Sequence, residues 1–75
     1  MKTRFVLSGG RTIEAIRDGS HVLVILKKGV KEKKQKFPAK MNTIVEFFEE
    51  DGSVCVTLRP PRGKTKKELM NFNLL

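Results

Sequence analysis

Short apolar segments alternate along the chain with turn residues at regular intervals. The apolar segments are RFVL, TIEAI, HVLVIL, TIVEFF and SVCVTL. Between them stand SGG, RDGS, KKG and EDGS, whose glycines and Asp-Gly steps supply the positive φ angles that tight hairpin turns require. Short strands divided by such turns are typical of an antiparallel β meander. The pattern therefore predicts a chain that is mainly all-β.

The most regular alternation lies in residues 43–58, TIVEFFEEDGSVCVTL. With Asp51-Gly52 as a two-residue turn, Phe48 stands opposite Cys55. This register collects apolar residues on one face of the hairpin. They are Val45, Phe47, Val54, Val56 and Leu58. The alternative is a helix over residues 41–50, where apolar residues also recur at helical spacing and Gly52 could end the helix. We favour the hairpin because its second strand accounts for both halves of the segment.

The segment HVLVIL, residues 21–26, is apolar at both parities after its first residue. A strand with this composition is buried on both faces, so we expect it to be the central strand of the sheet. Cys55, the only cysteine, lies within SVCVTL and is interpreted as a small strand residue.

Residues 27–40 follow directly and form what we term the lysine run, KKGVKEKKQKFPAK, with Glu32 as its only acidic residue. Its lysines are Lys27, Lys28, Lys31, Lys33, Lys34, Lys36 and Lys40. If Lys28-Gly29 turns the chain back, Val30 and Phe37 have opposite parity in the returning segment, so neither face forms a core stripe. The run is therefore predicted to be an edge strand or a loop outside the core.

Two interpretations of the lysine run stand side by side. Charge on an edge strand prevents sheet-to-sheet aggregation, and one or two lysines would suffice for that purpose. Seven lysines against one glutamate repel one another, and an anionic partner would relieve this repulsion. We favour a binding surface, with a solvated edge as the alternative.

The last part of the chain, RPPRGKTKKELMNFNLL, changes in character. Pro60-Pro61 is expected to end the sheet, because proline cannot continue a hydrogen-bonded ladder. Thr65 and Glu68 resemble a capping box and predict a short helix from about Lys66, with partial disorder as the alternative. We therefore expect a β-barrel domain over residues 1–58 and a basic C-terminal segment over residues 59–75. The second basic cluster consists of Arg59, Arg62, Lys64, Lys66 and Lys67.

The chain has 75 residues, which is enough for one domain with a small core. The turn spacing predicts a five- to six-stranded antiparallel barrel or bent sheet, compatible with SH3-like or OB-like architecture. No apolar run reaches the length of a membrane helix, and the N-terminus lacks the apolar core of a signal peptide. We expect a cytoplasmic protein.

The sequence offers little support for catalysis. Gly63–Thr65 reads GKT, like the end of a phosphate-binding loop, but the earlier glycine of that motif is replaced by Leu58. One cysteine and one histidine, His21, cannot complete a zinc site. The acidic residues around Asp51 are interpreted as solvated hairpin charge. We expect no enzymatic activity, no cofactor and no metal.

The charge balance is the strongest indication of function. Sixteen basic residues against eight acidic ones give a formal net charge of +8 and a pI of about 10.1. Such an excess points to nucleic acid as partner. The phosphate-contacting residues are predicted to be Lys27, Lys28, Lys31, Lys33, Lys34, Lys36, Lys40, Arg59, Arg62 and Lys64. Phe37 is the candidate for base stacking, with a place at the core edge as the alternative. We expect non-catalytic binding of the phosphate backbone, DNA or RNA, with duplex binding as its natural form.

The rival hypothesis is a protein-binding module. A small inhibitor or accessory subunit, of the kind that phages and plasmids encode, could dock its basic surface on an acidic protein partner. An exposed strand edge could also add to a partner's sheet. Adsorption to an anionic membrane is disfavoured, because the sequence contains no evident basic amphipathic helix.

Overall fold

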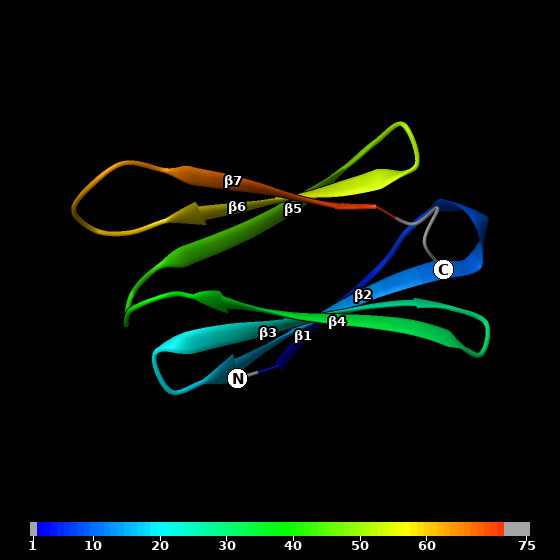
Figure 1. Cartoon of the computed structure of the whole chain (residues 1–75), viewed down its shortest axis with the longest axis horizontal. Helices are drawn as coiled ribbons and strands as arrows, with labels where there is room; N and C mark the ends of the chain where they lie inside the picture. The colour runs from blue at the N-terminus through cyan, green and yellow to red at the C-terminus, as the bar shows by residue number, and fades with distance from the viewer. Residues whose placement is uncertain (1, 72–75) are drawn as a thin grey trace. The chain divides into compact units, whose positions relative to one another are not determined.

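The computed structural model describes residues 2–71, which form seven strands in two antiparallel sheets (Figure 1). Sheet A contains, in this order, β1 (Lys2–Val6), β2 (Arg11–Asp18), β3 (His21–Lys28) and β4 (Lys31–Pro38). Sheet B contains β5 (Ile44–Glu50), β6 (Ser53–Arg59) and β7 (Lys66–Asn71). The chain divides between residues 38 and 39 into two compact units. Unit 1 carries sheet A and unit 2 carries sheet B.

The mainly all-β class is confirmed, whereas the closed five- to six-stranded barrel is wrong. The sheets are open, and β4 and β5 are not neighbours in either sheet. Between these two strands the chain turns at residues 40–43, where Asn42 has a φ of 67° and the Thr43 N–H donates to the Lys40 carbonyl at 3.1 Å. This turn interrupts the succession of hairpins, so β5 begins a new sheet instead of extending the first.

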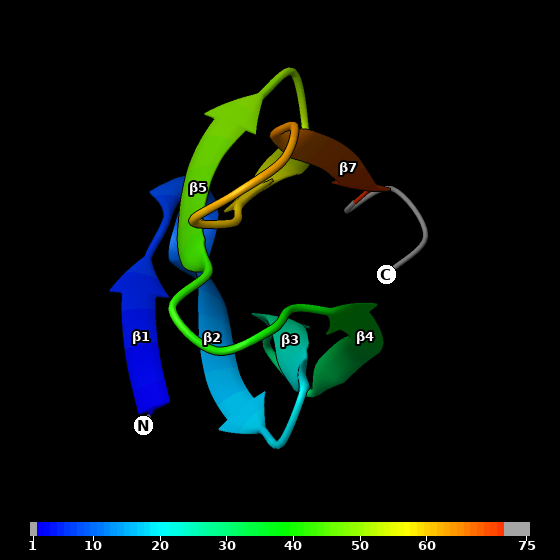
Figure 2. The same cartoon turned by 90° about the vertical axis from the view of Figure 1, so that its left-hand side faces the viewer.

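Sheet A is a four-stranded meander, and Figure 2 shows its strands following one another in chain order. The central position of β3 is confirmed, since β3 lies between β2 and β4 and four of its eight residues are buried, on both faces of the sheet. One face of the sheet, here called the core face, carries the buried apolar side chains. They are Ile13, Val22, Val24, Leu26 and Phe37. The opposite face is called the outer face.

The predicted hairpin of sheet B is confirmed in its register. Phe48 lies opposite Cys55, as the alternation of residues 43–58 requires, and the helical alternative for residues 41–50 is wrong. Asp51 and Gly52 both have positive φ, 43° and 78°, as the two central residues of a type I′ turn must. The core face of sheet B carries Val54, Val56, Leu58 and Met70, all buried.

The C-terminal helix predicted from about Lys66 is wrong, because residues 66–71 form strand β7. This strand pairs with β6 over its whole length and places Met70 opposite Val54 in the core. Without β7, one edge of the apolar strand β6 would expose unpaired backbone groups, and this cost outweighs a local helix cap. The expected domain boundary after residue 58 falls within unit 2, before the last residue of β6. Phe72 and the rest of the expected C-terminal helix lie outside the described residues.

The prediction that the lysine run forms an edge strand is confirmed, because β4 is the last strand of sheet A. The turn itself lies one residue later than expected. Gly29, with a φ of 62°, and Val30 are the two turn residues, so Lys28 stands opposite Lys31. Val30 is therefore fully exposed at the turn, and Phe37 alone brings β4 into the core.

Candidate nucleic-acid interface

The strand structure of β4 distributes the lysine run over both faces of sheet A. Side chains alternate between faces along a strand, so Lys34 and Lys36 lie on the outer face while Lys31 and Lys33 share the parity of the core face. Lys27 of β3 belongs to the outer face as well. The lysines of residues 27–40 therefore do not share one face. Three lie on the outer face, three have the parity of the core face, and Lys40 lies in the turn before β5.

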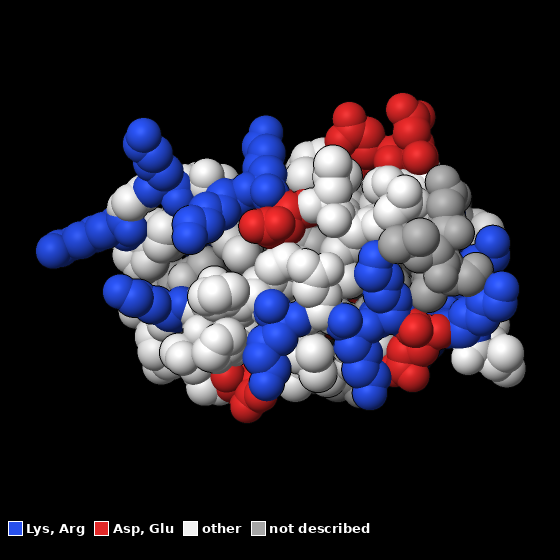
Figure 3. Space-filling view, in the orientation of Figure 1, with Lys and Arg blue, Asp and Glu red and all other residues white. Residues whose placement is uncertain are grey.

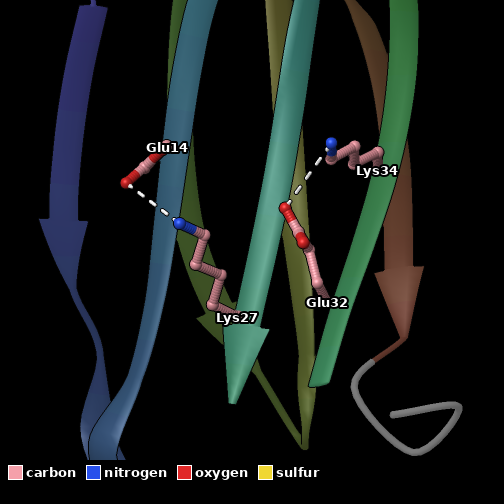
Figure 4. Close-up of polar contacts among 4 residues, drawn as sticks. All are labelled: Glu14, Lys27, Glu32 and Lys34. Atoms are coloured by element: carbon pink, nitrogen blue, oxygen red, sulfur yellow. Dashed lines mark ion pairs between the residues drawn. The ribbon is translucent and has the colours of Figure 1, made fainter. Parts of the chain in front are cut away.

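The lysines of the outer face lie beside carboxylates. The Lys36 ammonium is 3.1 Å from the Asp18 carboxylate, and Lys34 is 3.7 Å from Glu32. Lys27 lies 3.7 Å from Glu14. Figure 4 shows this pair and the pair of Lys34 with Glu32. Each pair neutralises a cation locally, so the outer face carries much less net charge than its lysines suggest.

Glu14 differs from the other two carboxylates because it is only 6% exposed. It stands at the middle of β2, in a cross-strand row with Arg4 and Ile25. A buried carboxylate that lost its cation would be strongly destabilising, so Lys27 is better understood as its structural partner than as a phosphate contact.

A second group of cations forms where β2 begins and the β3–β4 hairpin turns. Arg11, Lys28 and Lys31 lie directly opposite one another on three neighbouring strands. Lys33 follows two residues after Lys31 and therefore points to the same face. We call this group of four residues the cation corner. At the described positions of this face, sheet A carries no Asp or Glu, and neither Lys28 nor Lys33 forms an ion pair within residues 2–71.

Sequence reasoning did not include Arg11 among the binding residues, although the signal was present. The two-residue turn Gly19-Ser20 places Asp18 opposite His21, and this register carries Arg11 to a position opposite Lys28. Like charges directly opposite each other destabilise a sheet, so the cation corner is an unfavourable arrangement for the fold alone.

The second predicted cluster lies in unit 2. Arg59 ends β6 and its guanidinium is 3.6 Å from the Glu46 carboxylate. Arg62 and Lys64 are exposed in the loop that joins β6 to β7, and Lys40 is exposed in the turn before β5. Lys66 and Lys67, which belong to the same basic cluster but were not among the predicted phosphate contacts, are exposed at the start of β7.

Charge is segregated along unit 2. The end of sheet B that carries the β6–β7 loop is basic, whereas the β5–β6 turn at the other end carries Glu49, Glu50 and Asp51. Figure 3 shows Lys and Arg gathered over the β6–β7 loop and over β4, and Asp and Glu gathered at the β5–β6 turn. A polyanion would therefore be attracted to one end of this sheet and repelled from the other.

The structure places Phe37 in the core and Phe48 at the surface. Phe37 is 3% exposed and packs in the core, so the core-edge alternative describes it and it is not available for base stacking. Phe48 is 47% exposed on the outer face of sheet B, opposite Cys55. Hairpin parity already placed Phe48 on the face away from Phe47, which was the signal for its exposure.

Groups of three or more metal-ligating side chains are not found among residues 2–71, and no helix in that range is long and apolar enough to cross a membrane. The chain matches no protein-family model, no curated protein and no solved structure.

Proposed function

We propose that this protein binds nucleic acid without catalysis, through contacts between its basic side chains and the phosphate backbone. The observation that carries the proposal is the cation corner of sheet A. Arg11, Lys28 and Lys31 stand in one cross-strand row, with Lys33 beside them, on a face whose described positions hold no carboxylate. Opposed like charges weaken a sheet by a few tenths of a kcal/mol to about 1 kcal/mol per pair, and phosphate groups would remove that cost.

The lysines on the outer face of sheet A differ from those of the cation corner in their ion pairs. On the outer face, Lys34 and Lys36 lie within 4 Å of carboxylates. Such pairing of opposite charges is expected of a surface that faces only solvent. In the cation corner, Lys28 and Lys33 form no ion pair within residues 2–71. Cations without a carboxylate partner on the protein itself are the pattern expected of a surface that meets a polyanion.

Unit 2 supplies a second set of phosphate contacts. Arg62 and Lys64 project from the β6–β7 loop, and neither forms an ion pair within the described range. We therefore assign the contacts to Lys28, Lys31 and Lys33 in unit 1 and to Arg62 and Lys64 in unit 2. Lys27, Lys34, Lys36 and Arg59 are assigned to ion pairs with carboxylates instead.

A salt titration of binding tests the proposal. Fluorescence anisotropy of labelled duplex DNA, single-stranded DNA and RNA would be measured over a range of salt concentrations. Five phosphate contacts predict a slope of log affinity against log salt of about −4.5 on duplex DNA and about −3.5 on a single strand. A slope near zero, or no binding at low salt, would overturn the proposal.

The rival function, docking on an acidic protein, is favoured by one observation. β4 is an edge strand of sheet A, and an exposed edge can add to the sheet of a partner. Isolation of one host protein together with this chain, combined with no shift of random-sequence nucleic acid, would favour the rival.

A further inference from the structure

We propose that the outer face of sheet B is a stacking platform for single-stranded nucleic acid, on which Phe48 contacts a base. The inference rests on the proposed function and names its substrate class, an unpaired strand of DNA or RNA. It draws on a face that lies in unit 2 alone.

An apolar row crosses this face. Phe48, Cys55 and Leu69 lie directly opposite one another on β5, β6 and β7. The small Cys55 is buried between its neighbours, while Phe48 is 47% and Leu69 67% exposed. The ring of Phe48 and the side chain of Leu69 are thus exposed on either side of the buried Cys55. Four residues before Phe48 on β5, Ile44 is a further half-exposed apolar side chain on the same face.

Cations adjoin the apolar row on one side only. One row away, at about 7 Å along the strands, Lys67 and Glu46 lie on the same face on either side of Thr57. Arg59 follows on that face, where its guanidinium is held 3.6 Å from Glu46, and the β6–β7 loop with Arg62 and Lys64 comes next. The acidic β5–β6 turn lies beyond the row on its other side. A backbone bound here would run from Phe48 toward the basic loop.

This arrangement suits an unpaired strand and not a duplex. Bases within a duplex are stacked on one another and cannot offer a face to a side chain, whereas unpaired bases stack on aromatic side chains of β-sheet surfaces while cations follow the phosphates. The sequence preference expected of such a surface is weak, because every base has a π-face.

The chain contains no Trp and no Tyr, so a tryptophan at position 48 would be its only strong fluorophore. In Phe48→Trp, a base that stacks on the indole is expected to quench its emission as dT or rU oligonucleotides of about 12 nucleotides are added. Val6→Trp is the control, because Val6 is exposed, at 79%, and lies opposite Thr12 on the outer face of sheet A. Its emission is expected to stay unchanged at saturation.

Affinity provides the second measurement. Phe48→Ala is expected to weaken single-strand binding by roughly fivefold or more, and Phe48→Leu by less than Phe48→Ala. Binding of a duplex is expected to be unaffected by either variant, as is single-strand binding by Val6→Ala. The dT and rU oligonucleotides also show whether DNA or RNA is preferred.

The outcomes separate the two proposals. If no nucleic acid binds in a salt-dependent manner, the proposed function fails and the platform with it. If nucleic acid binds but Phe48→Trp is not quenched and Phe48→Ala binds single strands normally, the platform alone is overturned. Retention of a host protein that depends on Phe48, without quenching by oligonucleotides, would assign the face to a protein and also overturn it.

Discussion

The two faces of sheet A provide a comparison in which charge is constant and position varies. Lys28→Gln with Lys33→Gln removes two cations of the cation corner, and Lys34→Gln with Lys36→Gln removes two paired cations of the outer face. Each double variant lowers the formal net charge from +8 by two, so both have a formal net charge of +6. Any difference in binding between them then reflects where the charge stands.

The expected magnitude follows from the number of phosphate contacts. Losing two contacts makes the salt slope shallower by about 1.8 on duplex DNA and by about 1.4 on a single strand. With equal affinities at about 1 M salt as the reference, these slope changes correspond at about 0.15 M salt to a loss of affinity of roughly 30-fold on duplex DNA and 14-fold on a single strand. For the outer-face variant we expect a slope change well below 1, because Asp18 and Glu32 already neutralise Lys36 and Lys34 at 3.1 and 3.7 Å.

The assay is anisotropy at several salt concentrations, with chemical denaturation of both variants to confirm that they fold. Equal losses in the two variants would show that net charge alone governs binding, and the face-specific reasoning would be refuted. A larger loss in the outer-face variant would refute it more directly, because the paired lysines would then be the contacts.

Three further outcomes are expected. Lys28→Glu places a carboxylate opposite both Arg11 and Lys31. It should raise the free energy of unfolding by about 0.5–1.5 kcal/mol in urea denaturation and weaken nucleic-acid binding. A lower free energy of unfolding would contradict the repulsion inferred between these three cations. Gly52→Ala forces a side chain into positive φ at 78° and should cost about 1–2 kcal/mol in the same measurement, so an unchanged midpoint would argue against the type I′ turn. Cys55, 4% exposed, should react with an aromatic disulfide reagent only when urea opens sheet B, and rapid reaction in plain buffer would show that the thiol is accessible.

Much of the fold could be predicted because local patterns and tertiary packing agree. The hairpin of β5 and β6 combines clean alternation with an Asp-Gly turn, so its register followed residue by residue. The central place of β3 followed from residues that are apolar on both faces. In these segments local preference and the packing of the sheet favour the same structure.

The errors arose where a distant partner decides the outcome. Thr65 and Glu68 suit a helix start locally, but pairing with β6 makes residues 66–71 a strand. In β4, the lysine run left base stacking and a place at the core edge both open for Phe37, and pairing opposite Val22 places it in the core. Long-range pairing of this kind has no signature within a short window of sequence.

The candidate interface was located only in part, for a related reason. Counting lysines identified β4 but treated its charges as one set, although strand parity divides them. Arg11 was overlooked because it is far from the lysine run in sequence and joins it only through the pairing of β2 with β3. Composition shows how much charge a chain carries, and register decides which charges meet.

The two-residue turn at Gly29 and Val30 thereby acquires a role that its exposed position does not suggest. It sets the phase of everything that follows in β4, and a shift of one residue would exchange the faces of Lys33 and Lys34. Two chains with the same lysines but a turn shifted by one residue would carry those lysines on opposite faces of the sheet. Related sequences should therefore be aligned at this turn before the charges on each face of their sheets are compared.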